Sequence, residues 1–230
     1  MNIAFIPARC GSKSIPLKNI KEFCGRPLVY WCLEALQNSN NIDKIFVATD
    51  CQEIKTVVND FHFSKVSVYE RDKENANDTA STESVMVEFI NKNSFDDNDL
   101  FLLVQATSPF TQTKDFDEGL NRLKVEKSDS LLTCTRAKKF FWNNNNTPLN
   151  FDYFNRPRRQ DFDGILMENG AFYINSIKNI KKNINRLSGK VSIFEMREYA
   201  ATDIDEESDW IVAETLMYHY ILTKKKSLSD

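Results

Sequence analysis

The sequence contains few of the residue types on which metal and nucleophile chemistry usually depends. Its 230 residues include only two histidines, His62 and His219. A three-histidine metal site is therefore impossible, and a Ser-His-Asp triad would have to use one of these two residues. We expect both histidines to be ordinary structural or surface residues.

The cysteines are few and scattered, and no two of them form a CxxC pair. The five are Cys10, Cys24, Cys32, Cys51 and Cys134. An odd and scattered set argues against a disulfide framework or a zinc knuckle, and it favours the reducing cytoplasm as the location.

Long apolar runs and an excess of positive charge are also lacking. No apolar run reaches the ~18 residues that a membrane span needs, so we expect no membrane association. The first residues read as a strand rather than a cationic leader, which predicts no signal peptide. With a formal net charge of −3, the chain has no overall basic field for wrapping nucleic acid.

What the sequence does contain is an alternation of short apolar runs with helical patterns. Strands are predicted at residues 2–8, 44–50, 65–71, 99–109 and 130–137, and helices at 27–38, 51–61, 79–91 and 115–125. This alternation predicts an α/β fold with a Rossmann-like, mostly parallel sheet flanked by helices. Ligands of such sheets bind beyond the carboxyl ends of the strands. The polar residues that end these strands are Arg9, Asp50, Arg71 and Gln105.

Residues 138–165 have a different composition, rich in asparagine and aromatics and without periodicity. The aromatic residues are Phe140, Phe141, Trp142, Phe151, Tyr153 and Phe154. A mobile surface loop is one interpretation, but aromatic side chains favour burial. We therefore interpret 138–165 as a small inserted dimerisation subdomain, within a domain made of residues 1–137 and 166–230, and expect a homodimer. Strand-like alternation resumes at residue 165, and a helix over 206–223 is predicted last.

The loop after the first strand carries cations and hydroxyls around Gly11. Arg9, Ser12, Lys13 and Lys18 lie there, and such groups at a strand end are typical of a polyphosphate site. The alternative is a solvated basic turn. Neither the GxxxxGK[ST] loop nor the GxGxxG fingerprint is present.

Six segments together resemble the motifs of one known family. IPARCGSKSIPLKN (6–19) resembles the N-terminal signature of the CMP-sialic acid synthetases, the acylneuraminate cytidylyltransferases. Further motifs of that family resemble, in the same order, RDKENANDTAST (71–82), LVQATSPF (103–110), RPRRQ (156–160), ENGAFYI (168–174) and ATDIDEESD (201–209). The chain departs from the family pattern at Cys10, where glycine is frequent, and at Phe110-Thr111, where Leu-Arg is frequent.

The resemblance implies a reaction in which CTP and a nine-carbon 2-keto sugar acid give a CMP-sugar and pyrophosphate. Its implied catalytic residues are Arg9, Lys13 and Asp205. Its implied nucleotide-binding residues are Arg9, Ser12, Lys13, Lys18, Asn19, Arg71, Asp78, Ala80 and Thr82. On local chemistry alone, helix capping is the favoured explanation of Asp78, Thr79 and Ser81.

The same resemblance implies a sugar pocket. Its residues would be Gln105, Arg158, Gln160, Asn169 and Tyr173. A guanidinium matches the planar geometry of the sugar's carboxylate, which favours Arg158, but Arg156 and Arg159 are equally suitable in chemistry. Tyr173 alternates with Phe172 on a predicted strand, so ordinary core packing is its alternative role.

Two aspartates near the end of the sequence suit a metal ion. Asp203 and Asp205 have i, i+2 spacing, which places both carboxylates on one face of an extended segment. Paired oxygens are ligands for Mg²⁺, which would withdraw charge from the α-phosphate. The alternative is an acidic helix N-terminus formed with Glu206, Glu207 and Asp209. No residue stands out as a general base.

The sequence does not select one sugar acid. Trp142 and the pair Arg186-Leu187 fall where some family members carry residues that touch the sugar, so N-acetylneuraminate, a deaminated sialic acid, legionaminate and pseudaminate all remain open. The alternative functions are a CMP-Kdo synthetase, another sugar nucleotidyltransferase, or a non-catalytic nucleotide-binding homologue.

Overall fold

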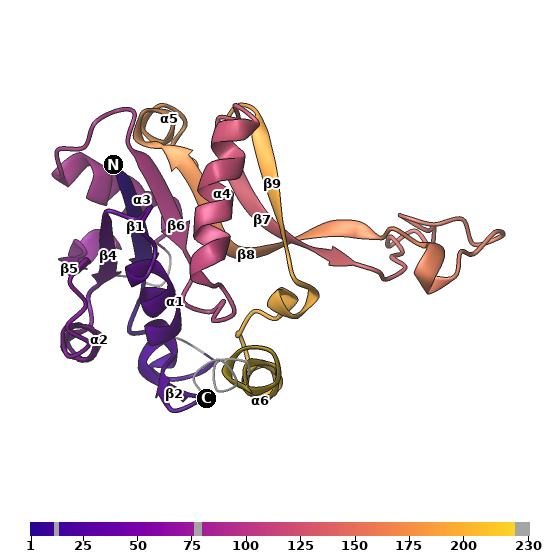
Figure 1. Cartoon of the computed structure of the whole chain (residues 1–230), viewed down its shortest axis with the longest axis horizontal. Coiled ribbons are helices and arrows are strands. Elements are labelled where there is room, and N and C mark those ends of the chain that lie inside the picture. The colour runs from indigo at the N-terminus through magenta and orange to yellow at the C-terminus, as the bar shows by residue number, and fades with distance from the viewer. Residues whose placement is uncertain (12–13, 76–79, 224–230) are drawn as a thin grey trace.

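A seven-stranded sheet with helices on both faces forms the body of the protein (Figure 1). The computed structural model describes residues 1–11, 14–75 and 80–223. The strand order is β5-β4-β1-β6-β8-β7-β9. The predicted α/β class, with a mostly parallel sheet flanked by helices, is confirmed.

The strands of this sheet are parallel except at β8. They are β1 (Asn2–Pro7), β4 (Lys44–Thr49), β5 (Val66–Glu70), β6 (Leu100–Val104), β7 (Ser130–Ala137), β8 (Ile165–Ser176) and β9 (Val191–Met196). β8 pairs antiparallel with β6 and β7, whereas the β1–β4, β1–β6, β4–β5 and β7–β9 pairs are parallel. The short strands β2 (Glu22–Phe23) and β3 (Arg26–Pro27) form a separate hairpin.

The helices pack in two layers, one on each face of the sheet. The helices are α1 (Leu28–Gln37), α2 (Gln52–Asn59), α3 (Thr82–Lys92), α4 (Thr113–Val125), α5 (Ile177–Asn183) and α6 (Glu207–Met217). α1, α2, α4 and α6 pack on one face of the sheet, and α3 and α5 on the other. α6 continues as a π-helical turn, η5 (Tyr218–Leu222). The 3₁₀ turns are η1 (Lys18–Ile20), η2 (Lys73–Asn75), η3 (Arg159–Asp161) and η4 (Glu198–Ala201).

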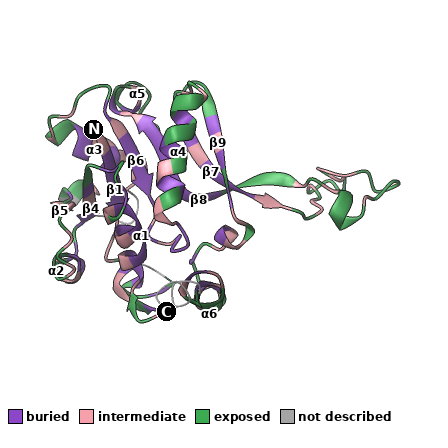
Figure 2. Cartoon of the chain, viewed as in Figure 1, coloured by how far each residue is buried: buried purple, intermediate pink, exposed green. Residues whose placement is uncertain are grey.

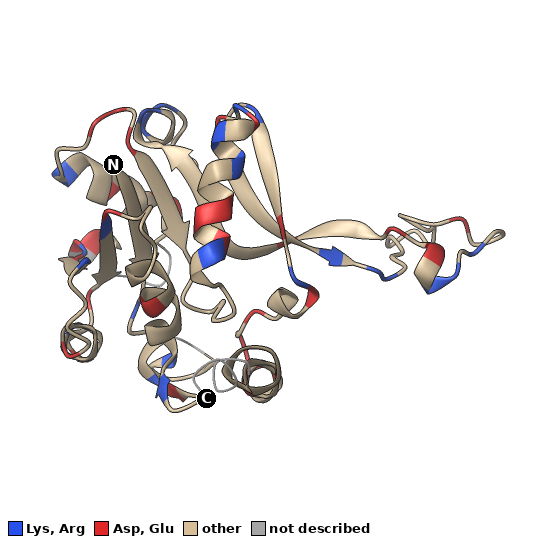
Figure 3. Cartoon of the chain, in the orientation of Figure 1, with Lys and Arg blue, Asp and Glu red and all other residues tan. Residues whose placement is uncertain are grey.

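β1 is buried on both faces, which explains why its sequence reads as a continuous apolar run. Ala4 and Ile6 pack in the core that includes α1, α2, α4 and α6, while Ile3 and Phe5 pack in the core with α3 and α5. Figure 2 shows the strands buried between the helices. Charged residues lie mainly on helices and on the loops at strand ends (Figure 3).

The structure differs from the predicted elements in three places. β6 ends at Val104 rather than at Pro109, because the chain turns beyond Gln105 with the Ser108 N–H bonded to the Gln105 carbonyl. β9 and α5 were not predicted. β9 (VSIFEM) buries Ser192 and exposes Val191, so apolar and polar residues do not alternate along it, and α5 spans only seven residues; neither therefore gives a strong periodic signal.

Residues 138–165 form an arm that projects from the body where β7 and β8 leave the sheet (Figure 1). Within the arm, Phe140 packs against Phe151 and Phe162 with ring centroids 4.4 and 4.9 Å apart. The Arg156 guanidinium lies 4.3 Å from the centroid of the Phe140 ring. In the described part of the chain, no helix combines the length and apolarity that crossing a bilayer requires.

Candidate functional site

A cavity of about 570 Å³ opens at the carboxyl ends of the central strands, where the strand pattern predicted a ligand site. Segments far apart in the sequence contribute its walls. They are Pro7, Arg9, Ser14, Lys18 and Asn19 after β1; Arg71 after β5; Ala80, Ser81, Thr82 and Val85 at α3; Gln105, Ala106 and Thr107 after β6; Gly170 and Tyr173 on β8; and Asp203 and Asp205 before α6.

Lys18 joins the first loop to the acidic segment. Its Nζ donates to the Ile204 carbonyl at 2.6 Å and to Asp205 Oδ1 at 3.2 Å, and the residue is 9% exposed. The Ser14 hydroxyl donates to the Asp205 carbonyl oxygen. The cationic loop and the acidic segment, nearly 190 residues apart in sequence, therefore face one cavity.

The carbonyl of Arg9 is held by the side chain of a neighbouring loop residue. Asn19 Nδ2 donates to the Arg9 carbonyl at 3.2 Å, which fixes the end of the loop to the turn that carries Lys18. Both Arg9 and Asn19 line the cavity. Two other residues that the resemblance implied for phosphate binding, Ser12 and Lys13, lie outside the described residues, so their roles stay predictions.

Arg71 lies at the back of the cavity and is 9% exposed. Its Nε donates to the Ala48 carbonyl at 2.9 Å. Burial lowers the pKa of Arg71, whereas the negative charges of Asp50 and Glu88 counteract part of that effect. A buried guanidinium fixed at one nitrogen retains further donors, and these suit anionic or carbonyl oxygens.

The segment before α3 combines helix capping with a place in the cavity wall. Ser81 is the N-cap of α3, and its Oγ accepts from the Ser84 N–H at 3.0 Å. Capping is therefore the observed role of Ser81. Ala80 and Thr82 line the cavity, while Asp78 lies outside the described residues.

Asp203 and Asp205 both line the same cavity. Partial removal from water raises the pKa of Asp203, and the neighbouring charge of Asp205 adds to the rise, whereas a hydrogen bond with Thr107 opposes it. A cation between the two carboxylates would relieve this repulsion.

The donor set fits a hard cation that also binds phosphate. Among the described residues, the group of three or more His, Cys, Asp or Glu close enough to share an ion is Cys10, Cys51 and Glu53, not the aspartates. Asp203 and Asp205 thus supply carboxylate oxygens but no complete cage. This pattern suits Mg²⁺, which keeps several waters and takes substrate phosphate oxygens as ligands.

The predicted sugar residues fall into two groups in the structure. Gln105 and Tyr173 line the cavity. The Tyr173 hydroxyl donates to Glu168, and burial raises the pKa of Tyr173 to about 12. The Arg186 guanidinium lies 4.9 Å from the centroid of the Tyr173 ring and donates to Glu83 at 2.6 Å.

The remaining predicted sugar residues do not line this cavity. Asn169 is buried against η4, where its Nδ2 donates to the Ala200 carbonyl at 2.9 Å. Arg158 and Gln160 lie in the arm, exposed and away from the cavity wall of their own chain. Their roles stay predictions.

Sequence reasoning missed several wall residues, among them Ser14, Val85, Thr107 and Gly170. Gly170 has φ +67°, and the β7–β8 register shifts between Leu132 and Cys134, in the part of β8 that faces the cavity. A glycine adopts this backbone conformation without strain. The NG pair in the ENGAFYI segment was the signal that could have identified Gly170.

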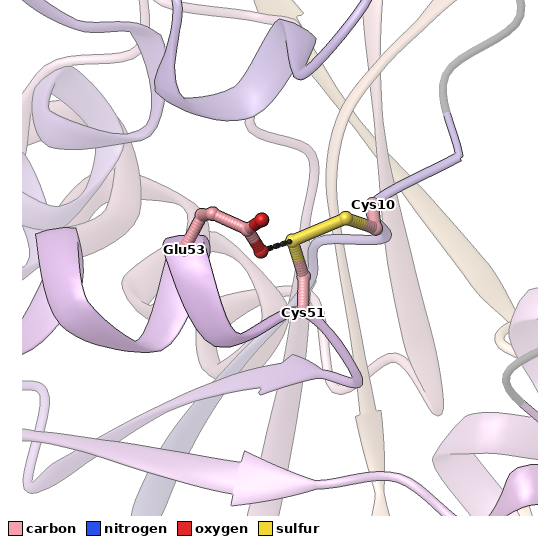
Figure 4. Close-up of side chains that lie close together, drawn as sticks. All are labelled: Cys10, Cys51 and Glu53. Atoms are coloured by element: carbon pink, nitrogen blue, oxygen red, sulfur yellow. Dashed lines mark hydrogen bonds between the residues drawn. A yellow bond between two sulfur atoms is a disulfide. The ribbon is translucent and has the colours of Figure 1, made fainter.

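Cys10 and Cys51 form a disulfide beside the cavity loop, with Cα atoms 5.1 Å apart (Figure 4). The scattered cysteine pattern did not predict this pair. Glu53 Oε2 lies 3.1 Å from Cys51 Sγ. Cys24, Cys32 and Cys134 are free. The cytoplasmic location stays a prediction.

Most of the chain is similar to known cytidylyltransferases. The model of a family described as cytidylyltransferase matches residues 3–227. The chain is 37% identical over 218 residues to the N-acylneuraminate cytidylyltransferase of Oncorhynchus mykiss, covering 92% of this chain and 49% of that protein. It thus spans about half the length of that relative.

Two further similarities cover both partners almost completely. The chain is 28% identical over 225 residues to the pseudaminic acid cytidylyltransferase of Campylobacter jejuni, covering 94% of this chain and 95% of that protein. The fold matches a CMP-2-keto-3-deoxy-manno-octonic acid synthetase complexed with CTP, with a TM-score of 0.70 over 96% of this chain and 100% of the other. At 18% identity, this last match shows a common fold.

Proposed function

The chain belongs to the cytidylyltransferase family, and on that premise we propose that it activates a sialic-type nine-carbon sugar acid with CTP. The products are the CMP-sugar and pyrophosphate. One observation carries the proposal: Lys18 contacts both Ile204 and Asp205, so a cationic loop and a carboxylate pair face one cavity. A nucleoside triphosphate needs both kinds of group at once, cations for its oxygens and carboxylates for its metal ion.

The reaction is a substitution at the α-phosphorus of CTP. The anomeric hydroxyl oxygen of the sugar acid forms the new P–O bond and releases its proton to solvent, and the bond to the departing diphosphate breaks. This transfer depends on in-line positioning and on neutralising charge rather than on covalent help from the protein. Arg9, Lys18 and Arg71 line the cavity and would neutralise phosphate oxygens there.

Asp203 and Asp205 would hold Mg²⁺, as their donor atoms suit that ion. When bound, the ion supplies charge neutralisation at the phosphates. The protein's own contribution is to hold both aspartates at the cavity wall. Lys18 fixes Asp205 there through its 3.2 Å contact.

The nucleoside and the sugar acid would lie against different residues of the cavity wall. The nucleoside would lie against Ala80 and Thr82 at the start of α3, and the sugar acid against Gln105 and Tyr173. Main-chain groups and the Thr82 hydroxyl can distinguish cytosine from uracil, because the two bases differ in their donors and acceptors.

We further propose that the active form is a homodimer joined through the arm, residues 138–165. Exposed aromatic residues in the arm support this, since Phe154 is 80% exposed. In a dimer, Arg158 of one chain would reach the sugar carboxylate in the cavity of the other.

The deciding experiment is a panel of sugar acids incubated with CTP and Mg²⁺ and assayed for pyrophosphate. The panel contains N-acetylneuraminate, its deaminated analogue, legionaminate, pseudaminate and the eight-carbon acid Kdo. We expect pyrophosphate and a CMP-sugar with a nine-carbon acid, and no pyrophosphate without acid. Faster release with Kdo or with a sugar 1-phosphate would overturn the substrate class. CTP binding without turnover of any acid would identify a non-catalytic homologue.

A further inference from the structure

The carboxylate of Glu88 lies behind the cavity wall and collects hydrogen bonds from the end of β5 and the turn after it. Glu88 lies on α3, and its side chain is 6% exposed. Its Oε1 accepts from the Tyr69 hydroxyl at 2.6 Å and from the Asp72 backbone N–H at 2.9 Å. Its Oε2 accepts from the Asn75 side-chain amide at 2.6 Å. These donors all come from residues 69–75.

This stretch is the one that brings Arg71 to the cavity. Arg71 lies between Tyr69 and Asp72, so two of the donors to Glu88 flank it in the sequence. The Glu88 charge also favours the guanidinium form of Arg71. The described chain resumes at Ala80, which lines the cavity and leads into α3, the helix that carries Glu88. Glu88 therefore ties α3 to the segment that precedes it.

Glu88 is ionised in this setting. Burial alone would raise the pKa of Glu88, but hydrogen bonds from Tyr69, Asn75 and the Asp72 N–H outweigh burial, so its pKa lies below the usual value. A carboxylate so little exposed stays charged only where donors compensate it.

A surface ion pair does not explain this arrangement. Lys92 Nζ lies 3.6 Å from Glu88 Oε1, farther than the hydrogen-bond donors. Lys92 also contacts Asp72, and its side chain is 46% exposed. Exposed i, i+4 pairs of this kind contribute little to stability. The close contacts of Glu88 point instead to the turn over residues 72–75.

We propose that Glu88 is a positioning residue for nucleotide binding. Its charge holds residues 69–75 so that Arg71 faces the cavity. Glu88 does not line the cavity, and it acts through Arg71 and the turn. The inference rests on the proposed function, which supplies CTP as the ligand of that cavity.

The test compares the full chain with its Glu88→Gln variant by titrating each with CTP and Mg²⁺ in a calorimeter, and by steady-state turnover with N-acetylneuraminate. Glutamine keeps the size of the side chain and one acceptor oxygen, but it loses the charge. We expect the Kd and KM for CTP to rise about tenfold, with kcat and the KM for the acid within about twofold of wild type. A role in folding alone would lower the fraction of active protein and leave CTP affinity unchanged.

Glu126→Gln is the matched control. Glu126 also has a lowered pKa, because it accepts from the Ser192 hydroxyl at 2.6 Å and from Arg122 Nε at 2.8 Å. It follows α4 and does not line the cavity. Its substitution should leave CTP affinity unchanged.

Tyr69→Phe tests the same inference with less risk to folding. It removes one donor to Glu88 and should weaken CTP binding about threefold. CTP affinity within twofold of wild type in Glu88→Gln, or in Tyr69→Phe where Glu88→Gln does not fold, overturns the role of Glu88. Absence of CTP binding by the wild-type protein overturns the proposed function instead, and the wild-type titration alone distinguishes the two.

Discussion

The cavity and the arm differ in where the contact partners of their side chains come from. In the cavity, groups from distant parts of the sequence satisfy one another: Lys18 contacts Ile204 and Asp205, and Arg71 contacts Ala48. In the arm, the aromatic contacts are among residues of the arm itself. Phe140 and Phe151 pack at 4.4 Å, and Tyr153 and Phe154 at 4.1 Å.

The two regions also differ in what they leave exposed. Lys18 and Arg71 are each 9% exposed, whereas Trp142, Tyr153 and Phe154 in the arm are 51%, 53% and 80% exposed. Exposed aromatic clusters mark interaction surfaces. The comparison teaches that the chain assembles a polar cavity from distant segments but leaves aromatic side chains of the arm exposed, which is the basis of the proposed homodimer.

The largest effect is expected in the cavity. Asp205→Asn should reduce kcat about 100- to 1,000-fold, because it removes a carboxylate proposed to hold Mg²⁺. Steady-state turnover across a Mg²⁺ titration measures this loss. Glu207→Gln is the matched control: Glu207 lies in the first turn of α6, accepts from Lys21 Nζ at 2.8 Å and does not line the cavity. It should change stability by less than about 1 kcal/mol and leave turnover near wild type. Equal losses in both variants would contradict the assignment.

A smaller effect is expected when the arm's apolar surface is removed. Replacing Trp142, Tyr153 and Phe154 together by serine should weaken the homodimer about 100-fold, because the aromatic contact area is lost. Sedimentation velocity over a concentration series measures the dimer affinity. An unchanged dimer would show that the arm is not the interface.

Arg158→Ala should act on the sugar acid rather than on CTP. We expect about a tenfold rise in the KM for the acid and no change in the KM for CTP, since the proposed contact is with the carboxylate. Complementation shows which chain provides the contact. At an acid concentration well below the wild-type KM, a 1:1 mixture of Arg158→Ala and Asp205→Asn proteins should recover roughly a quarter of wild-type turnover if the contact crosses a twofold dimer. No recovery would place Arg158 outside the partner's site.

The smallest effect is expected on the stability of the monomer when one exposed aromatic residue of the arm is replaced. Phe154→Ser should change the free energy of unfolding by less than about 0.5 kcal/mol, because exposed substitutions remove little packing. Urea unfolding at a concentration below dimerisation provides the measurement. A loss above about 1 kcal/mol would show that the arm stabilises its own chain.

The parts of the fold that were predictable from sequence are those with a strong periodic signal. The apolar run at residues 2–7 and the helical spacing over 28–37 gave β1 and α1 to within a residue at each end. β9 was missed because it buries the polar Ser192 and exposes the apolar Val191, so its sequence shows neither an apolar run nor a strict alternation of apolar and polar residues.

Site residues were predictable where they belong to a sequence motif of the family. They were not predictable where only the fold brings them together. Arg9, Arg71 and Asp205 were expected at one site and do line one cavity. The pairing of Cys10 with Cys51 follows from the adjacency of β1 and β4, since each cysteine comes just after one of these parallel strands. Strand order is not encoded in local periodicity, so this pair was not foreseeable.

β8 couples the two regions mechanically. Its first residues, Ile165 to Met167, are exposed at the base of the arm; Gly170 and Tyr173 face the cavity; and its last residues pair with β6. A force on the arm is therefore transmitted along one continuous backbone to the cavity wall. If docking of a second copy shifts this strand, dimerisation changes the affinity of the cavity for substrate. Bound substrate then changes the affinity of the two chains for each other by the same factor.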